Sequence, residues 1–143
     1  MSATPPEGFP VIDPEIESQL LSTKLGIEIT DWTPRRMVAT MPVKGNLQPY
    51  GLLHGGANAV LAETLGSIAA ALNAPPGLAV LGLDLSCTHH RAATSGYVTA
   101  VCTPVHAGRS TATYEIVISD EQGKRTCTSM LTCILRDGVP GRK

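Results

Sequence analysis

Between Lys44 and Asp84 the chain carries a single acidic or basic side chain, Glu63. The stretch around Glu63 is rich in alanine and leucine, and it ends at Ala74-Pro75-Pro76-Gly77, which is a strong signal for the end of a helix. An ionised carboxylate among apolar side chains is costly unless it is paired or used in chemistry. We therefore predict one long apolar helix that carries a functional carboxylate near its middle.

The two faces of this predicted helix differ in side-chain size. At 100° per residue, the bulky side chains fall roughly opposite Glu63: Leu61, Leu65, Ile68 and Leu72. Small residues lie within about 40° of Glu63: Gly56, Ala59, Ser67, Ala70 and Ala74. We expect the bulky face to pack against a sheet and the small face to meet a partner or a substrate. The alternative is an ordinary exposed Glu63, although a solvated helix face normally carries several charges.

Length and charge narrow the class of protein. The chain has 143 residues, of which 43% are hydrophobic, and this suits one domain with a core of its own. The net charge is −1, aromatic residues make up 3%, and no basic stripe is present, so nucleic-acid binding is disfavoured. We expect a small-molecule partner instead.

Targeting and cysteine patterns indicate a cytoplasmic protein without a membrane anchor. No apolar stretch reaches the roughly 18 residues of a membrane span, and the first residues do not resemble a signal peptide. The cysteines lack Cys-x-x-Cys spacing, and we expect reduced thiols within strands: Cys87, Cys102, Cys127 and Cys133. The four histidines lack the close spacing of metal ligands, so no metal site is predicted.

The residues before the long helix indicate a short helix and two strands. The short helix should have Asp13 as its N-cap and Pro14 at its first position. Its apolar face would hold Ile16, Leu20 and Leu21. The strands are expected at about 25–32 and 35–43.

After the long helix, alternating side chains and short turns predict four strands, at about 79–91, 97–106, 110–119 and 125–136. Asp120-Glu121-Gln122-Gly123 should form the last hairpin. This order predicts an α+β fold in which an antiparallel sheet wraps around one long central helix. We expect a single domain over residues 14–137, between a flexible tail at 1–13 and a C-terminal tail at 138–143.

The order of elements and the stretch from Gln48 to Ser67 resemble the hotdog-fold acyl-CoA thioesterases of the phenylacetate-pathway type. Within that family, the resemblance is to the branch of hydroxybenzoyl-CoA, dihydroxynaphthoyl-CoA and enterobactin-proofreading thioesterases. It spans roughly residues 14–137. The most specific motifs are these: His54-Gly55-Gly56 followed by Leu61-Ala62-Glu63, His89-His90-Arg91, and Thr103-Pro104-Val105-His106-Ala107-Gly108-Arg109.

Thioester hydrolysis needs a group that polarises the carbonyl and a group that attacks it or activates water. The backbone N–H groups of Gly55 and Gly56 stand at the start of the predicted helix, where unpaired donors suit an oxyanion. The alternative for this Gly-Gly pair is a simple turn. Glu63 is the expected nucleophile or general base, and its residue type allows both roles.

The resemblance assigns two more residues to the catalytic site, and helical spacing from Glu63 suggests a third. It implies that Gln48 orients the thioester and that His54 steadies the loop or bonds near the carbonyl. Ser67, one helical turn after Glu63, would hydrogen-bond a water or the carboxylate. A structural Ser67 that bonds back to the Glu63 carbonyl is the competing interpretation.

The resemblance also implies a grip on coenzyme A, which belongs to the substrate, and no other cofactor is expected. The implied CoA contacts are His89, His90, Arg91, His106, Gly108, Arg109 and Ser110, with Gly82 lining the pantetheine path. Guanidinium groups suit phosphates, so Arg91 and Arg109 are the candidates for the nucleotide end. The alternative for each of these cations is an ordinary surface charge.

Helix geometry favours a site shared by two chains. Eight residues separate Gly55 from Glu63, a rise of about 12 Å, so one chain cannot easily place both groups on the same carbonyl carbon. Two antiparallel helices across a two-fold axis would bring one subunit's helix start to the middle of the other. We therefore expect a homodimer as the active unit, and the resemblance implies a homotetramer.

The expected function is hydrolysis of an acyl-CoA or aryl-CoA thioester, with an acyl-carrier protein as the other candidate carrier. A non-catalytic acyl-CoA-binding module is the alternative, but it would not need a carboxylate at Glu63. A hotdog dehydratase is a third interpretation, which the His-Gly-Gly motif fits less well.

Overall fold

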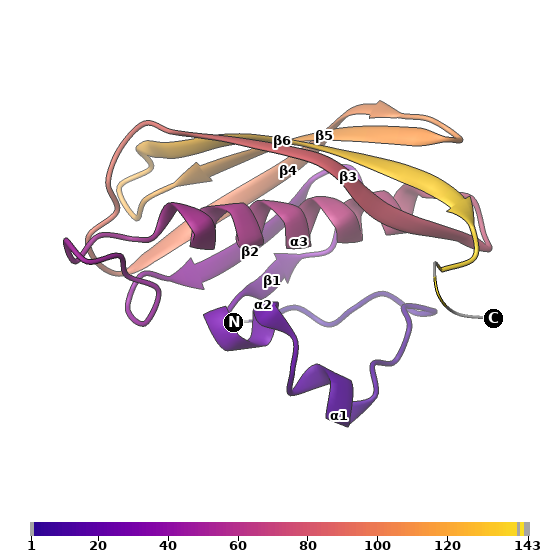
Figure 1. Ribbon diagram of the computed structural model, residues 1–143, viewed down its shortest axis with the longest axis horizontal. Coiled ribbons are helices and arrows are strands. Elements are labelled where there is room, and N and C mark those ends of the chain that lie inside the picture. The colour runs from indigo at the N-terminus through magenta and orange to yellow at the C-terminus, as the bar shows by residue number, and fades with distance from the viewer. Residues whose placement is uncertain (1, 140, 142–143) are drawn as a thin grey trace.

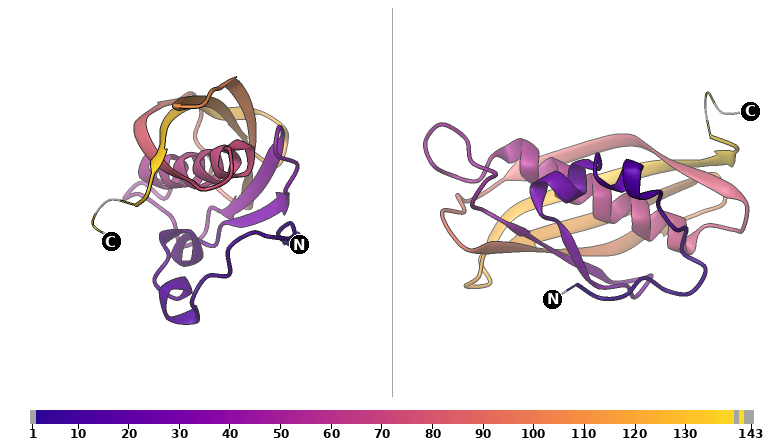
Figure 2. Two further views of the ribbon diagram at one scale, coloured as in Figure 1. Left: turned by 90° about the vertical axis from the view of Figure 1, so that its right-hand side faces the viewer. Right: turned by 90° about the horizontal axis from the view of Figure 1, so that it is seen from below.

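The computed structural model describes residues 2–139 and 141. Six strands form one antiparallel sheet that curls around a long helix, α3 (Gly55–Asn73) (Figure 1). The view along α3 shows the sheet wrapping over the helix, with the N-terminal segment on the open side (Figure 2, left). This arrangement confirms the predicted α+β class and the sheet wrapped around one central helix.

Strand order along the sheet is β1-β2-β4-β5-β6-β3. The strands are β1 (Glu28–Asp31), β2 (Met37–Pro42), β3 (Leu78–His89), β4 (Tyr97–Ala107), β5 (Thr111–Ser119) and β6 (Arg125–Asp137). Every neighbouring pair is antiparallel. The four strands after the helix lie within about two residues of their predicted bounds, whereas β1 and β2 are shorter than expected. The long strand β3 lies at an edge of the sheet.

Both ends of α3 follow from local chemistry. His54 is the N-cap, and its ring nitrogen Nδ1 accepts the Gly56 N–H at 2.8 Å. At the other end Ala74 adopts an extended conformation (φ −71°, ψ 149°), which is the backbone that a following proline requires. The helix therefore begins and ends where the sequence predicts.

The N-terminal helix differs from the prediction. Asp13 is its N-cap, as expected, and accepts the Glu15 N–H at 2.8 Å. However, α1 (Pro14–Glu17) stops after one turn, and a second helix, α2 (Leu21–Leu25), begins after Leu20. The expected single apolar face of Ile16, Leu20 and Leu21 was wrong. No residue of α1 is buried, so no packing holds a longer helix together.

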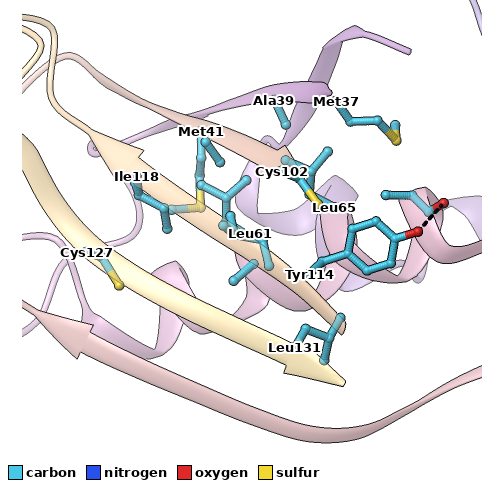
Figure 3. Packing of buried hydrophobic residues seen from close by; sticks show 14 of the residues in the cluster. Met37, Ala39, Met41, Leu61, Leu65, Cys102, Tyr114, Ile118, Cys127 and Leu131 are labelled. Atoms are coloured by element: carbon cyan, nitrogen blue, oxygen red, sulfur yellow. Dashed lines mark hydrogen bonds between the residues drawn. The ribbon is translucent and has the colours of Figure 1, made fainter. Parts of the chain in front are cut away.

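The hydrophobic core fills the space between α3 and the concave face of the sheet (Figure 3). Leu61 and Leu65 of α3 are fully buried and face the sheet, as the size difference between the helix faces predicts. Strand β5 alternates as expected, with Tyr114 among its buried residues. The Tyr114 hydroxyl donates to the Ala69 carbonyl at 3.4 Å and ties the sheet to the helix. Each fully buried leucine contributes roughly 1.5–3 kcal/mol.

All four cysteines are free thiols, which confirms that prediction. Cys102, Cys127 and Cys133 are buried. Burial, together with the smaller effect of the neighbouring Cys133, raises the pKa of Cys102 to about 12. The three buried thiols therefore stay protonated and act as small core side chains.

The N-terminal residues lie against β1 and the loop after it. The Ala3 N–H donates to the Ile29 carbonyl at 2.8 Å, and the Trp32 Nε1–H donates to the Ala3 carbonyl at 3.0 Å. The predicted boundary after residue 13 stays a prediction, and residues 1, 140, 142 and 143 of the two predicted tails lie outside the described residues. Across the described residues, no helix combines the length and the apolar character needed to cross a membrane.

Candidate active site

Two pockets lie along α3. One contains Gly55, the expected oxyanion donor, and the other contains the carboxylate of Glu63. The first, about 370 Å³, lies at the helix start and is lined by Gln48, Gly55, Asn58, His89 and Arg91, among others. The second, about 400 Å³, contains Glu63. The Gly55 N–H and the Glu63 carboxylate of one chain therefore face different pockets, in agreement with a rise of about 12 Å between them.

His54 changes the expected set of oxyanion donors. Its Nδ1 accepts the Gly56 N–H, so this nitrogen carries no proton in that bond. The Gly56 donor is thus occupied, and the expectation of two glycine donors is corrected to one. The Gly55 N–H has no acceptor among the described residues and lies at the positive end of the α3 dipole.

Gln48 belongs to the turn that leads into α3. Its carbonyl oxygen Oε1 accepts backbone N–H groups from Tyr50 and, at 3.5 Å, from Leu52. Its own backbone N–H donates to the Leu52 carbonyl at 2.8 Å. These bonds hold the side chain at the first pocket, and within the described residues its Nε2 donor has no partner. Gln48 and Gly55 therefore line the same pocket.

Glu63 lies between α3 and the edge strand β3. Its pocket is otherwise formed by Leu21, Ala59, Val60, Thr64 and Leu85. A methyl group on Gly82 would overlap the Oε1 atom of Glu63, so the absent side chain at position 82 is what makes room for the carboxylate. Arg36 and Asp31 form the one ion pair found among residues 2–139 and 141, so Glu63 has no cationic partner there.

Ser67 and Cys133 lie close to Glu63. Burial raises the pKa of the Cys133 thiol, the Glu63 carboxylate raises it further, and a hydrogen bond from Ser67 lowers it. The Ser67 hydroxyl thus lies near the Cys133 thiol, a neighbour that neither interpretation of Ser67 anticipated. A serine already beside Glu63 needs only a side-chain rotation to reach a bound water.

The residues expected to hold coenzyme A form two separate groups. His89 pairs with Cys127 near the start of β6, and it is followed by His90 and Arg91. The second group, His106, Gly108, Arg109 and Ser110, lies near the other end, where the Leu135 N–H donates to the Ser110 carbonyl at 2.9 Å. Eight residues of strand (127 to 135) span about 26 Å. One chain therefore does not bring Arg91 and Arg109 to the same phosphate.

Several lining residues were not anticipated from the sequence. Leu21 and Leu85 form apolar walls of the Glu63 pocket, and Leu21 comes from the misassigned N-terminal helix. Asn58 lies in the first turn of α3 with 5% of its surface exposed, on the same face as Leu61 and Leu65. A polar residue within that apolar face was the available signal. Within the described residues, no three His, Cys, Asp or Glu side chains are grouped as metal ligands.

Comparison with known proteins agrees with this geometry. The family model of the thioesterase superfamily matches residues 50–127. Proofreading thioesterase EntH of Cronobacter turicensis is 53% identical over 109 residues, which cover 76% of this chain and 80% of that protein. Thioesterase HI1161 of Haemophilus influenzae has a TM-score of 0.82 at 38% identity, over 90% of this chain and 91% of that chain. A mutant of thioesterase PA1618 of Pseudomonas aeruginosa has a TM-score of 0.80 at 36% identity, over 85% and 88%.

A six-stranded antiparallel sheet around one helix, shared with these solved structures, defines a hotdog-fold protein. The chain belongs to the thioesterase superfamily, and it is a hydrolase of thioesters. The family resemblance drawn from its sequence motifs is confirmed.

Proposed function

We propose that this thioesterase hydrolyses an acyl-CoA or aryl-CoA to the free acid and CoA, in a site shared by two chains of a homodimer. The observation that carries the proposal is the placement of Glu63. It is a carboxylate without a described cationic partner, in a mainly apolar pocket that Gly82 keeps open. Apolar walls suit the acyl or aryl group, and a carboxylate beside it suits attack on the carbonyl.

The chemistry assigns one task to each group. The thioester oxygen takes hydrogen bonds from the Gly55 N–H and from Gln48 Nε2, which stabilise the oxyanion as it forms. Glu63 either attacks the carbonyl carbon, giving an acyl-enzyme anhydride that water cleaves, or takes a proton from the attacking water. In both routes the carbon–sulfur bond breaks and CoA leaves as the thiolate, which becomes the thiol by taking the proton that the consumed water releases. Ser67 holds the water, and His54 fixes the loop through its bond to Gly56.

Two chains are needed because each supplies one half of the site. The face of α3 around Glu63 carries small residues, so a second helix can approach it closely. Antiparallel helices across a two-fold axis place Gly55 of one chain near Glu63 of the other and generate two equivalent sites. We further propose that such dimers pair into a tetramer. The free thiols support a reducing, cytoplasmic setting.

Replacement of Glu63 by glutamine tests the catalytic assignment. The amide keeps the size of the side chain but cannot attack or accept a proton, so turnover should fall at least about 10²-fold. Turnover should be measured on aryl-CoA, medium-chain acyl-CoA and acyl-carrier-protein thioesters, which also identifies the carrier. Glu115→Gln, on the face of β5 directed away from the core, is the matched control and should keep wild-type turnover. Near-normal turnover in Glu63→Gln would refute the assignment.

The proposed CoA contacts are tested at Arg91 and Arg109, which we assign to the phosphates. Replacement of each by alanine should raise KM for CoA thioesters much more than it lowers kcat. Pantetheine thioesters lack the nucleotide phosphates and should be nearly indifferent to the change. Arg36→Ala, at the far Asp31 pair, is the control. Equal damage with both substrates would place the arginines in the fold or in the catalytic step.

A further inference from the structure

We propose that Asn58 is a positioning residue, which holds the imidazole of His89 against the Gly55 end of the first pocket with its proton on Nε2. The effect of this hydrogen bond on catalysis rests on the proposed function, in which the Gly55 N–H donates to the oxyanion. The hydrogen bond itself rests on the geometry alone. It concerns two residues that are 31 positions apart in the chain and meet beneath one pocket.

The geometry places the His89 ring between Asn58 and Gly55. Asn58 Nδ2 lies 3.4 Å from His89 Nδ1. At the other side of the ring, His89 Nε2 lies 2.9 Å from the position that a side-chain carbon on Gly55 would occupy. With the amide nitrogen of Asn58 toward the ring, this nitrogen can only donate, so we infer that Nδ1 is the acceptor and that the proton of the neutral ring is on Nε2; the opposite amide orientation would require a proton on Nδ1.

Stability does not account for an asparagine at position 58. Its Oδ1 atom is buried and has no hydrogen-bond partner among the described residues. An unpaired buried carbonyl oxygen destabilises a fold, and a leucine of similar size would avoid it on a face that already carries Leu61 and Leu65. The amide is therefore explained by what its nitrogen does, which is to orient His89.

The orientation supplies a third hydrogen-bond donor, in addition to the proposed donors Gly55 N–H and Gln48 Nε2. With Nδ1 held by Asn58, the His89 Nε2–H is at the Gly55 end of the pocket, where the thioester oxygen gains negative charge. A ring with the opposite tautomer would present a lone pair there and repel that charge. His89 is exposed enough to touch substrate, while Asn58 is buried beneath it and acts only through the ring.

The test combines NMR with kinetics. ¹⁵N–¹H correlation spectra of the protein without substrate, at a pH where the imidazole is neutral, should show His89 protonated on Nε2 and bare on Nδ1. In Asn58→Leu we expect a mixture of tautomers and about a tenfold loss of kcat with little change in KM. Asn58→Asp keeps the size but only accepts, so it should move the proton to Nδ1 and lower kcat as well. On a His89→Ala background, Asn58→Leu should cause no further loss.

Asn73→Leu is the matched control, because it removes an asparagine with three hydrogen bonds from the opposite end of α3. It should lower stability but leave the His89 spectrum and kcat unchanged. A wild-type His89 protonated on Nδ1 would overturn the inference, as would an unchanged kcat in variants whose tautomer has shifted. The NMR result needs no substrate, so it stands apart from a failure of the Glu63→Gln test.

Discussion

Gly82 is the residue on which the position of the Glu63 carboxylate depends. In Gly82→Ala the new methyl group would overlap Glu63 Oε1, the end of a flexible side chain that can rotate away. We therefore expect the fold to survive and kcat to fall at least about tenfold, because the displaced carboxylate loses its alignment. Enzyme assays and thermal unfolding of the same preparation measure the two effects separately.

Gly123 provides the control for the Gly82→Ala prediction, because we expect its replacement to change stability and not kcat. It has open space around its Cα but a left-handed backbone (φ +76°) in the β5–β6 turn. Gly123→Ala should therefore lower the melting temperature and leave kcat unchanged. If Gly82→Ala behaved in the same way as Gly123→Ala, the close approach at Gly82 would be structural rather than catalytic.

At the residue scale, the sequence predicts groups whose role follows from local composition. Glu63 stands out because its surroundings lack charge, and Gly55 because it opens a helix. The contacts between Ser67 and Cys133, and between Asn58 and His89, join distant positions. They depend on how β3 and β6 lie against α3, and no local spacing carries that information.

At the scale of the elements, α3 packs closely on β6 at Gly66. An added Cβ there would lie 2.6 Å from Cδ2 of Leu131, which is fully buried and has little room to move. Alanine gains about 1 kcal/mol in helix propensity over glycine, while overpacking costs about 1–3 kcal/mol. We expect Gly66→Ala to be destabilised by about 1 kcal/mol in urea unfolding.

Ala71, on the exposed side of α3, provides the control for the Gly66→Ala prediction. Ala71→Gly changes propensity without touching the core, and should cost about 1 kcal/mol. A Gly66→Ala protein more stable than wild type would mean that Leu131 finds another rotamer at no cost. The two variants together separate propensity from packing.

Elements with strong periodicity were predicted well, and the weakly packed ones were not. Strand β5 alternates cleanly because one of its faces is buried, and α3 ends at a proline pair. The break between α1 and α2 lacks such a signal. Ser18 bonds back to the Glu15 carbonyl at 2.9 Å, and no buried side chain opposes the break.

For the whole molecule, the proposed shared site predicts complementation between two inactive chains. Glu63→Gln lacks the carboxylate, and Gly55→Ala brings a methyl group 2.9 Å from His89 Nε2, which should disturb the helix start. A mixed dimer of the two retains one intact site. Random assembly gives about half mixed dimers, so about a quarter of wild-type activity should return.

Differently tagged chains allow mixed dimers to be purified and counted before they are assayed. Each variant assembled alone should stay inactive after the same unfolding and refolding treatment, which controls for reactivation. Verified mixed dimers without activity would indicate a site formed within one chain, despite the two separate pockets at Gly55 and Glu63.

Trp32 is the single tryptophan of the chain, and the N-terminal residues cover it. Its indole N–H is bonded to the Ala3 carbonyl, and the Phe9 ring meets it edge-on, with centroids 5.0 Å apart. Indole fluorescence shifts to longer wavelength when water replaces such contacts. The emission spectrum of Trp32 therefore reports whether residues 3–9 are bound to the sheet, and the measurement needs no added fluorescent label.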